Sequence, residues 1–113
     1  MSQLMHYQNC IEKLLTAHGE RVPVNGEIEC QLVFDRQHHH YQLVDLGWDD
    51  QHRVYNCVFH LDIKDDKIWI QRNQTDTSIV EEMISMGVDK NDIVLGLQPP
   101  YVREMVAASS DAD

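Results

Sequence analysis

The segment 27–35, EIECQLVFD, alternates between apolar and polar residues, and this pattern constrains the fold more than any other feature. Its apolar side carries Ile28, Cys30, Leu32 and Phe34. Successive side chains of a β-strand point to opposite faces of the sheet, so this pattern predicts a strand with one buried and one wet face.

Three further strands are predicted at short spacing, over residues 40–48, 53–64 and 67–72. Asp49-Asp50-Gln51-His52 is predicted to form a turn, and Asp65-Asp66 a tight hairpin. Asp66 stands where a type I′ turn prefers glycine, so some strain is expected there. Short connections favour an antiparallel meander in chain order.

The faces of this sheet follow from the alternation. In the third strand we expect an apolar face of five residues: Tyr55, Cys57, Phe59, Leu61 and Ile63. The opposite face is less polar than a solvated face should be, because it carries Val33, Val58 and Trp69, with Tyr41 and Leu43 or Val44 nearby. A covering C-terminal segment or a protein interface is the expected explanation, because soluble monomers seldom leave large apolar patches bare.

Helical spacing marks residues 3–18 and a second segment that ends at Met86, capped by Asp76 or Thr77 with Glu81 and Glu82 toward solvent. A short helical turn is predicted at 89–92. The fold class is therefore α+β: a four-stranded antiparallel β-meander with an N-terminal helix and C-terminal helices packed on it. One domain is expected over 1–106, and a disordered acidic tail over 107–113.

The charge balance limits the partners of this chain. Lys and Arg number 9 and Asp and Glu 19, which gives a net charge of −10. Direct binding to nucleic acid or to anionic membranes is disfavoured. We expect no membrane span and no signal peptide. The odd, widely spaced cysteines Cys10, Cys30 and Cys57 suggest reduced thiols and a cytoplasmic location.

The run His38-His39-His40 suggests a metal site, but alternation lets only His38 and His40 share a face. Zinc then needs further ligands. His60, His52 and Asp62 are candidates that no spacing rule selects. A solvated, histidine-rich loop edge is favoured, and neither metal nor cofactor is expected.

A nuclease motif and a cysteine–histidine pair are two catalytic interpretations that the sequence supports only weakly. Asp62-Ile63-Lys64 has the layout of metal-dependent nucleases if Asp45 or Asp49 supplies a second carboxylate, but the motif is short and common. Cys57 with His60, or Cys30 with any histidine, could form a nucleophile pair, yet thiols on apolar strand faces stay protonated and inert. We expect no catalytic residues.

Five long segments carry a resemblance to a known family: HYQNCIEKLLTAHG (6–19), GEIECQLVFD (26–35), HYQLVDLGW (40–48), RVYNCVFHLDIKDDKIWIQRNQTD (53–76) and GVDKNDIVLGLQPPYVRE (87–104). They resemble the XisI family, the fdxN-element excision controlling factors of cyanobacteria, over about nine tenths of the chain. Asp66 in place of a turn glycine and the triple histidine depart from the family's pattern.

The resemblance implies a non-enzymatic regulatory protein that acts with an XisH-like companion in site-specific DNA excision or a related process. Charge complementarity suits an acidic adaptor for a basic, DNA-acting protein. Trp48 and Trp69 are the predicted anchors of this interface, and Asp49 and Asp50 its steering charges. The alternatives are a nuclease that uses Asp62 and Lys64, and a homodimer built on the bare sheet face.

Overall fold

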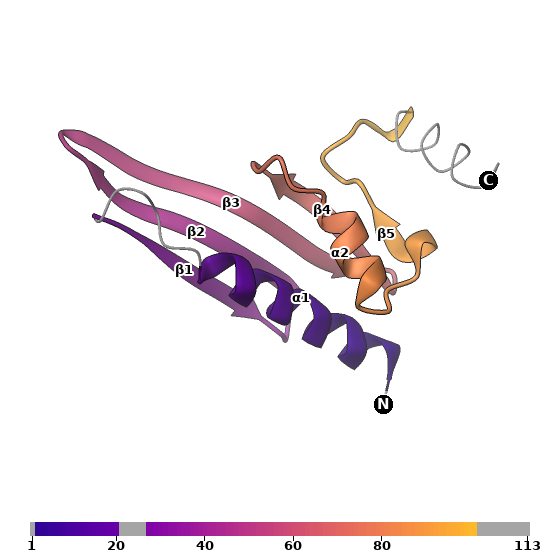
Figure 1. Ribbon diagram of the computed structural model, residues 1–113. Coiled ribbons are helices and arrows are strands. Elements are labelled where there is room, and N and C mark those ends of the chain that lie inside the picture. Colours follow the sequence, from indigo (N-terminus) through magenta and orange to yellow (C-terminus); the bar gives the residue numbers. More distant parts are fainter. Residues whose placement is uncertain (1, 21–26, 102–113) are drawn as a thin grey trace.

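The computed structural model describes residues 2–20 and 27–101 and shows one sheet with both helices on the same side (Figure 1). The elements, in chain order, are α1 (Gln3–Gly19), β1 (Ile28–Asp35), β2 (His40–Asp49), β3 (His52–Lys64), β4 (Lys67–Asn73), α2 (Ile79–Ser85), a 3₁₀ turn (Lys90–Asp92) and β5 (Ile93–Val94). The molecule is elongated, with extents of 49 × 32 × 24 Å, because β2 and β3 form a long hairpin.

The sheet confirms the predicted meander and adds a strand to it. Its order is β1-β2-β3-β4-β5, and the first four strands pair antiparallel. The prediction of four antiparallel strands was wrong at the edge, because β5 pairs parallel to β4 at Ile68↔Ile93 and Trp69↔Val94. The chain crosses over through α2 and so returns in the direction of β4. A strand of two residues is too short to show alternation.

The hydrophobic core lies between the helices and one sheet face. Its fully buried side chains are Ile11, Leu15, Tyr41, Phe59, Leu61, Ile68, Ile70, Ile79 and Met83. Helix α1 begins as a capped helix, since the Ser2 hydroxyl accepts a hydrogen bond from the Met5 amide at 3.1 Å. Tyr41 belongs to this core, which corrects its expected place near the opposite face. Leu43 belongs to it as well, so of the two alternatives for that face, Leu43 or Val44, only Val44 can lie there.

Helix α2 begins later than predicted. Its N-cap is Ser78, not Asp76 or Thr77. The Asn73 side chain donates to the Thr77 carbonyl at 3.0 Å, so a turn uses the residues expected to cap the helix. Gly87, at φ 97°, follows the end of α2 as predicted.

A β-bulge reverses the expected faces of β3. The β2–β3 register shifts between Leu43 and Val44, so Leu43 pairs with Phe59 but Val44 pairs with Cys57. Val58 packs against the core, whereas Tyr55 is 74% exposed. The prediction that Tyr55 and Cys57 share the core face with Phe59 was therefore wrong. One extra residue in a strand moves every side chain beyond it to the other face.

The hairpin turns agree with the sequence. Asp65 and Asp66 have φ of 55° and 61°, the left-handed conformation of a type I′ turn that glycine normally supplies. Asp50, between β2 and β3, has φ 55° as well. The predicted domain end at 106 and the tail 107–113 lie outside the described residues.

Candidate functional site

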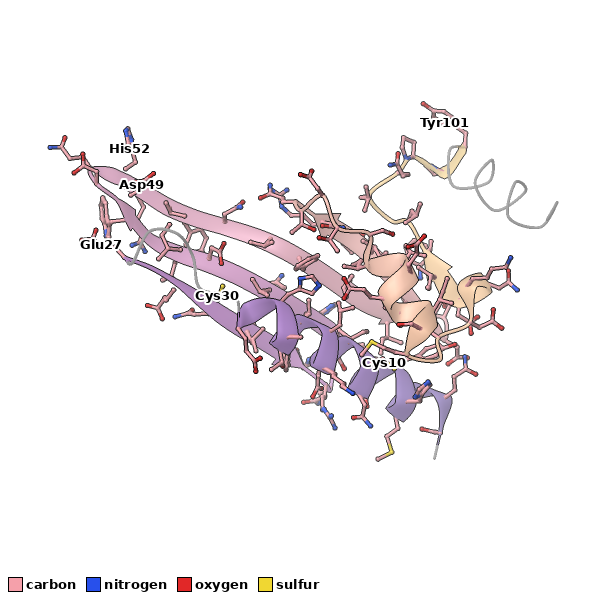
Figure 2. The ribbon with its side chains drawn as sticks, viewed as in Figure 1. Cys10, Glu27, Cys30, Asp49, His52 and Tyr101 are labelled. Carbon is pink, nitrogen blue, oxygen red and sulfur yellow. The ribbon has the colours of Figure 1, made fainter. Side chains whose placement is uncertain are left out.

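The end of the β2–β3 hairpin combines exposed aromatic rings with acidic side chains. Trp48 is 48% exposed, its ring lies under the Arg53 guanidinium at 5.4 Å, and Tyr55 is more exposed still. Asp49 and Asp50 follow Trp48 and are exposed. Figure 2 shows Asp49, His52 and Glu27 at this same end of the sheet. We call Trp48, Asp49, Asp50 and Tyr55 the hairpin-end surface.

The structure separates the fourth predicted interface residue from this surface. Trp48 pairs with Arg53, whereas Trp69 pairs with Asp62, nine residues further along β3. At about 3.3 Å per residue the two tryptophans lie roughly 30 Å apart. Trp69 is half-buried and donates from Nε1 to the Lys64 carbonyl at 3.1 Å. The four predicted interface residues therefore do not form one patch, and Trp69 lies apart from the hairpin-end surface.

At the other end of the strands, two histidines and an aspartate meet on the sheet face away from the helices. His40 in β2 pairs directly with Asp62 in β3, and His60 precedes Asp62 by two residues on the same face. Asp62 Oδ1 lies 2.9 Å from His40 Nδ1 and 2.9 Å from His60 Nε2. We call these residues the His40–His60–Asp62 cluster.

Neighbouring strands hold the cluster in place. Gln71 in β4 donates to Asp62 Oδ2 at 3.2 Å, and the Gln42 amide lies 3.5 Å from His60 Nδ1. Partial burial by itself would raise the pKa of the Asp62 carboxyl. The hydrogen bond from His40 and the charge and hydrogen bond of His60 outweigh burial and lower that pKa. Asp62 is therefore a carboxylate at neutral pH.

The other histidines considered as metal ligands lie elsewhere. His38 Nδ1 is 2.8 Å from Asp35 Oδ2 within the β1–β2 turn. His52 is at the far end of the sheet (Figure 2). The expected pair of His38 and His40 is thus divided, and strand pairing selects His60 and Asp62 instead. Sequence spacing could not select them because a cross-strand partner depends on the register.

The nuclease arrangement is not assembled by the residues proposed for it. Asp45 and Asp49 pair with Asn56 and His52, whereas Asp62 pairs with His40. The five residue steps from His40 to Asp45 span roughly 16 Å of strand, too far for two carboxylates to share a metal ion. Lys64 lies over the Trp69 ring at 4.9 Å. Asp62 is surrounded by imidazoles rather than by a second carboxylate.

The thiols are free and their environments keep them protonated. Burial and the Asp45 carboxylate raise the pKa of Cys30 to about 11, and the thiol donates to Asp45 Oδ1 at 2.8 Å. Burial also raises the pKa values of Cys10 and Cys57. Cys57 has left the apolar face on which it was predicted, but the inertness expected of the thiols agrees with these directions.

A hollow that sequence reasoning missed lies where α1 meets the 3₁₀ turn, with a volume of about 550 Å³. The Tyr7 hydroxyl donates to Asp92 Oδ2 at 2.6 Å, and Gln3 Nε2 donates to the same oxygen at 2.8 Å. These polar side chains, which line the hollow, are therefore hydrogen-bonded to one another. They join the first helix to the C-terminal part of the fold, and no short-range pattern could have revealed them.

Comparison with known proteins identifies the family. The model of the XisI protein family matches residues 1–109. This chain belongs to the XisI family. The assignment made from sequence segments is confirmed. No curated protein matches this chain.

Two crystal structures of proteins from Anabaena variabilis are similar to this chain. The first, an XisI-like protein, is 46% identical with a TM-score of 0.85, and the match covers 90% of this chain and 94% of that one. The second, the fdxN element excision controlling factor XisI, is 30% identical with a TM-score of 0.79, and the match covers 92% of this chain and 95% of that one. The α+β architecture is thus that of XisI-like proteins. Among the described residues, no helix is long and apolar enough to cross a membrane.

Proposed function

We propose that this XisI-family protein is a non-enzymatic accessory factor that acts inside the cell by binding a protein partner. The partner is an XisH-like protein, and the process is site-specific DNA excision or a related one. Family membership and the similarity to an fdxN element excision controlling factor support this assignment. The exposed rings and carboxylates of the hairpin-end surface are the observation that supports binding to a protein partner.

The chemistry of that surface suits a basic partner with an apolar recess. Exposed Trp and Tyr supply large contact areas at low entropic cost and are frequent energetic anchors of interfaces. Asp49 and Asp50 add negative charge beside the rings, in a chain whose net charge is −10. Opposite charge across an interface accelerates encounter and fixes orientation more than it adds affinity. A DNA-acting protein offers such a basic surface.

A binding assay with a matched charge control tests this proposal. The XisH-like protein from the same genome is titrated with wild-type chain, with Asp49→Lys/Asp50→Lys, and with Asp65→Lys/Asp66→Lys, at low and moderate salt. The two variants change the net charge equally. The first replaces one residue at positive φ, Asp50, and the second replaces two, Asp65 and Asp66. We expect the first to weaken association at low salt by about tenfold and to flatten its salt dependence. The second should have a much smaller effect.

Two further variants test the anchors. Trp48→Ala and Tyr55→Ala remove exposed rings and should each reduce affinity by about tenfold or more, the cost typical of an interface anchor. If both aspartate pairs contribute equally, or if the ring variants bind like wild type, the hairpin-end surface is not the contact. Light scattering on the free chain shows whether it forms a homodimer, the alternative to binding an XisH-like protein.

A further inference from the structure

We propose that the His40–His60–Asp62 cluster is a binding site for one divalent transition-metal ion of the zinc type. The inference does not depend on the proposed partner, because the cluster lies at the opposite end of the strands from the hairpin-end surface. It rests on the identity, the spacing and the support of three donor groups.

The donor set suits such an ion. Two imidazole nitrogens and one carboxylate oxygen are ligands that Zn²⁺, Co²⁺ and Fe²⁺ accept, whereas Mg²⁺ and Ca²⁺ require mostly oxygen. The ligand atoms of the cluster all lie within 4.8 Å of one another. A tetrahedral ion with bonds of about 2.0–2.1 Å separates its ligand atoms by about 3.3 Å. Side-chain rotations that shorten the wider separations would bring the three atoms to this geometry.

The backbone places these donors firmly. All three ligands project from paired strands, and the His40↔Asp62 pair brings the two chain segments together. Ile63 donates to the His39 carbonyl at 3.1 Å, which ties the start of β2 to the end of β3 beside the cluster. Sites built on strands hold their geometry more precisely than sites on loops. An entering ion therefore finds the donors already converged.

The surrounding residues provide outer support. Gln71 holds Asp62 Oδ2 and leaves Oδ1 directed between the two rings. Such outer hydrogen bonds orient metal ligands and typically change affinity by about 10–100-fold. Gln42 stands beside the second nitrogen of His60. With its amide oxygen turned to that nitrogen, Gln42 would accept the ring proton and leave Nε2 free to bind a metal.

The cluster remains open on one side. The His40 side chain is 56% exposed, His60 30% and Asp62 17%. Three protein ligands leave at least one coordination position of the ion to water or another small ligand. The site is thus of the open type rather than a closed structural centre with four protein ligands.

Metal titration of tag-free, chelator-treated protein tests the proposal. Zn²⁺ binding is followed by calorimetry, and Co²⁺ binding by its visible absorption, which reports coordination number. We expect one ion per chain and a Co²⁺ spectrum with nitrogen and oxygen ligands. His60→Gln and Asp62→Asn should each weaken Zn²⁺ binding by about 100-fold or more, and Gln71→Ala by about tenfold.

His38→Gln and His52→Gln are the matched controls, because they remove histidines outside the cluster. Both should bind Zn²⁺ like wild type. Circular dichroism with chelator present verifies that each variant is folded, and a misfolded Asp62→Asn is replaced by His40→Gln for the same comparison. The proposal is overturned if wild type binds no ion, or if binding survives Asp62→Asn and His60→Gln but is lost in His38→Gln.

Discussion

Replacing Gly47 by alanine should destabilise the protein strongly, because β1 and β2 approach each other too closely there for a side chain. Gly47 pairs with Ile28 and has φ of 152°. A Cβ atom built on Gly47 would overlap the Glu27 carbonyl oxygen and lie 2.8 Å from Ile28 Cα. Both neighbours are backbone atoms, so no side-chain rotation can relieve the overlap.

The magnitude follows from two contributions. A non-glycine residue in this region of φ costs about 1–3 kcal/mol. Displacing the start of β1 to relieve the overlap adds a cost of about 1–3 kcal/mol, as for other overpacked sites. A loss of about 3 kcal/mol is a large part of the 5–15 kcal/mol of a typical domain. With a urea m-value of about 1–3 kcal/mol/M, the unfolding midpoint should fall by about 1–3 M.

Gly19→Ala is the matched control and should have the opposite sign. A Cβ there would lie 3.5 Å from Leu32 Cδ2 and 3.6 Å from Leu43 Cδ1, which is ordinary contact. Gly19 is the last residue of α1, and alanine is favoured over glycine in a helix by up to about 1 kcal/mol. Urea unfolding followed by circular dichroism compares both variants with wild type. An unchanged midpoint for Gly47→Ala would refute the argument from close backbone approach.

Three other outcomes are expected. Tyr7→Phe should lower the free energy of unfolding by about 1–3 kcal/mol, because it removes a hydrogen bond to the Asp92 carboxylate; equal urea midpoints would contradict this. Cys30 should react far more slowly than a free thiol with a disulfide reagent at neutral pH, because its pKa is raised to about 11; fast labelling of the folded protein would exclude that environment. Hydrogen bonds from the His38 backbone and ring lower the pKa of the Asp35 carboxyl in the folded protein. The Asp35 carboxylate therefore stabilises the fold at pH values above its unfolded-state pKa. This contribution disappears as the pH falls through its folded-state pKa. Asp35→Asn should therefore be less stable than wild type near neutrality, and thermal melts should show the difference shrinking in acid.

The hairpin-end surface was only partly predicted from the sequence. The predicted turn at Asp49-Asp50 is found between β2 and β3, and Trp48 beside it is exposed. The role of these residues as partner contacts stays a prediction. Tyr55 was missed, since its place in an alternating apolar run indicated burial. The bulge at Val58 of β3, opposite Leu43 and Val44, turns Tyr55 to the other face, and no local residue pattern marks it.

The His40–His60–Asp62 cluster shows the same limit. All three residues were considered as ligands, but His38 and His52 were considered beside them with equal weight. Residues close in sequence share a face by alternation, which associates His60 with Asp62. The choice of His40 as their neighbour depends on the register between two strands.

By itself the sequence determined the family, through the resemblance of five long segments to XisI proteins. It also determined the antiparallel meander and the order of the elements other than β5, because alternation, helical spacing and turn residues act over a few positions. Only the tertiary structure decided the parallel fifth strand, the side of the sheet that Tyr55 and Cys57 occupy, and the convergence of His40 with His60 and Asp62. The reason is physical: register and crossover direction are set by how the whole sheet packs on its helices, and a shift of one residue exchanges its faces.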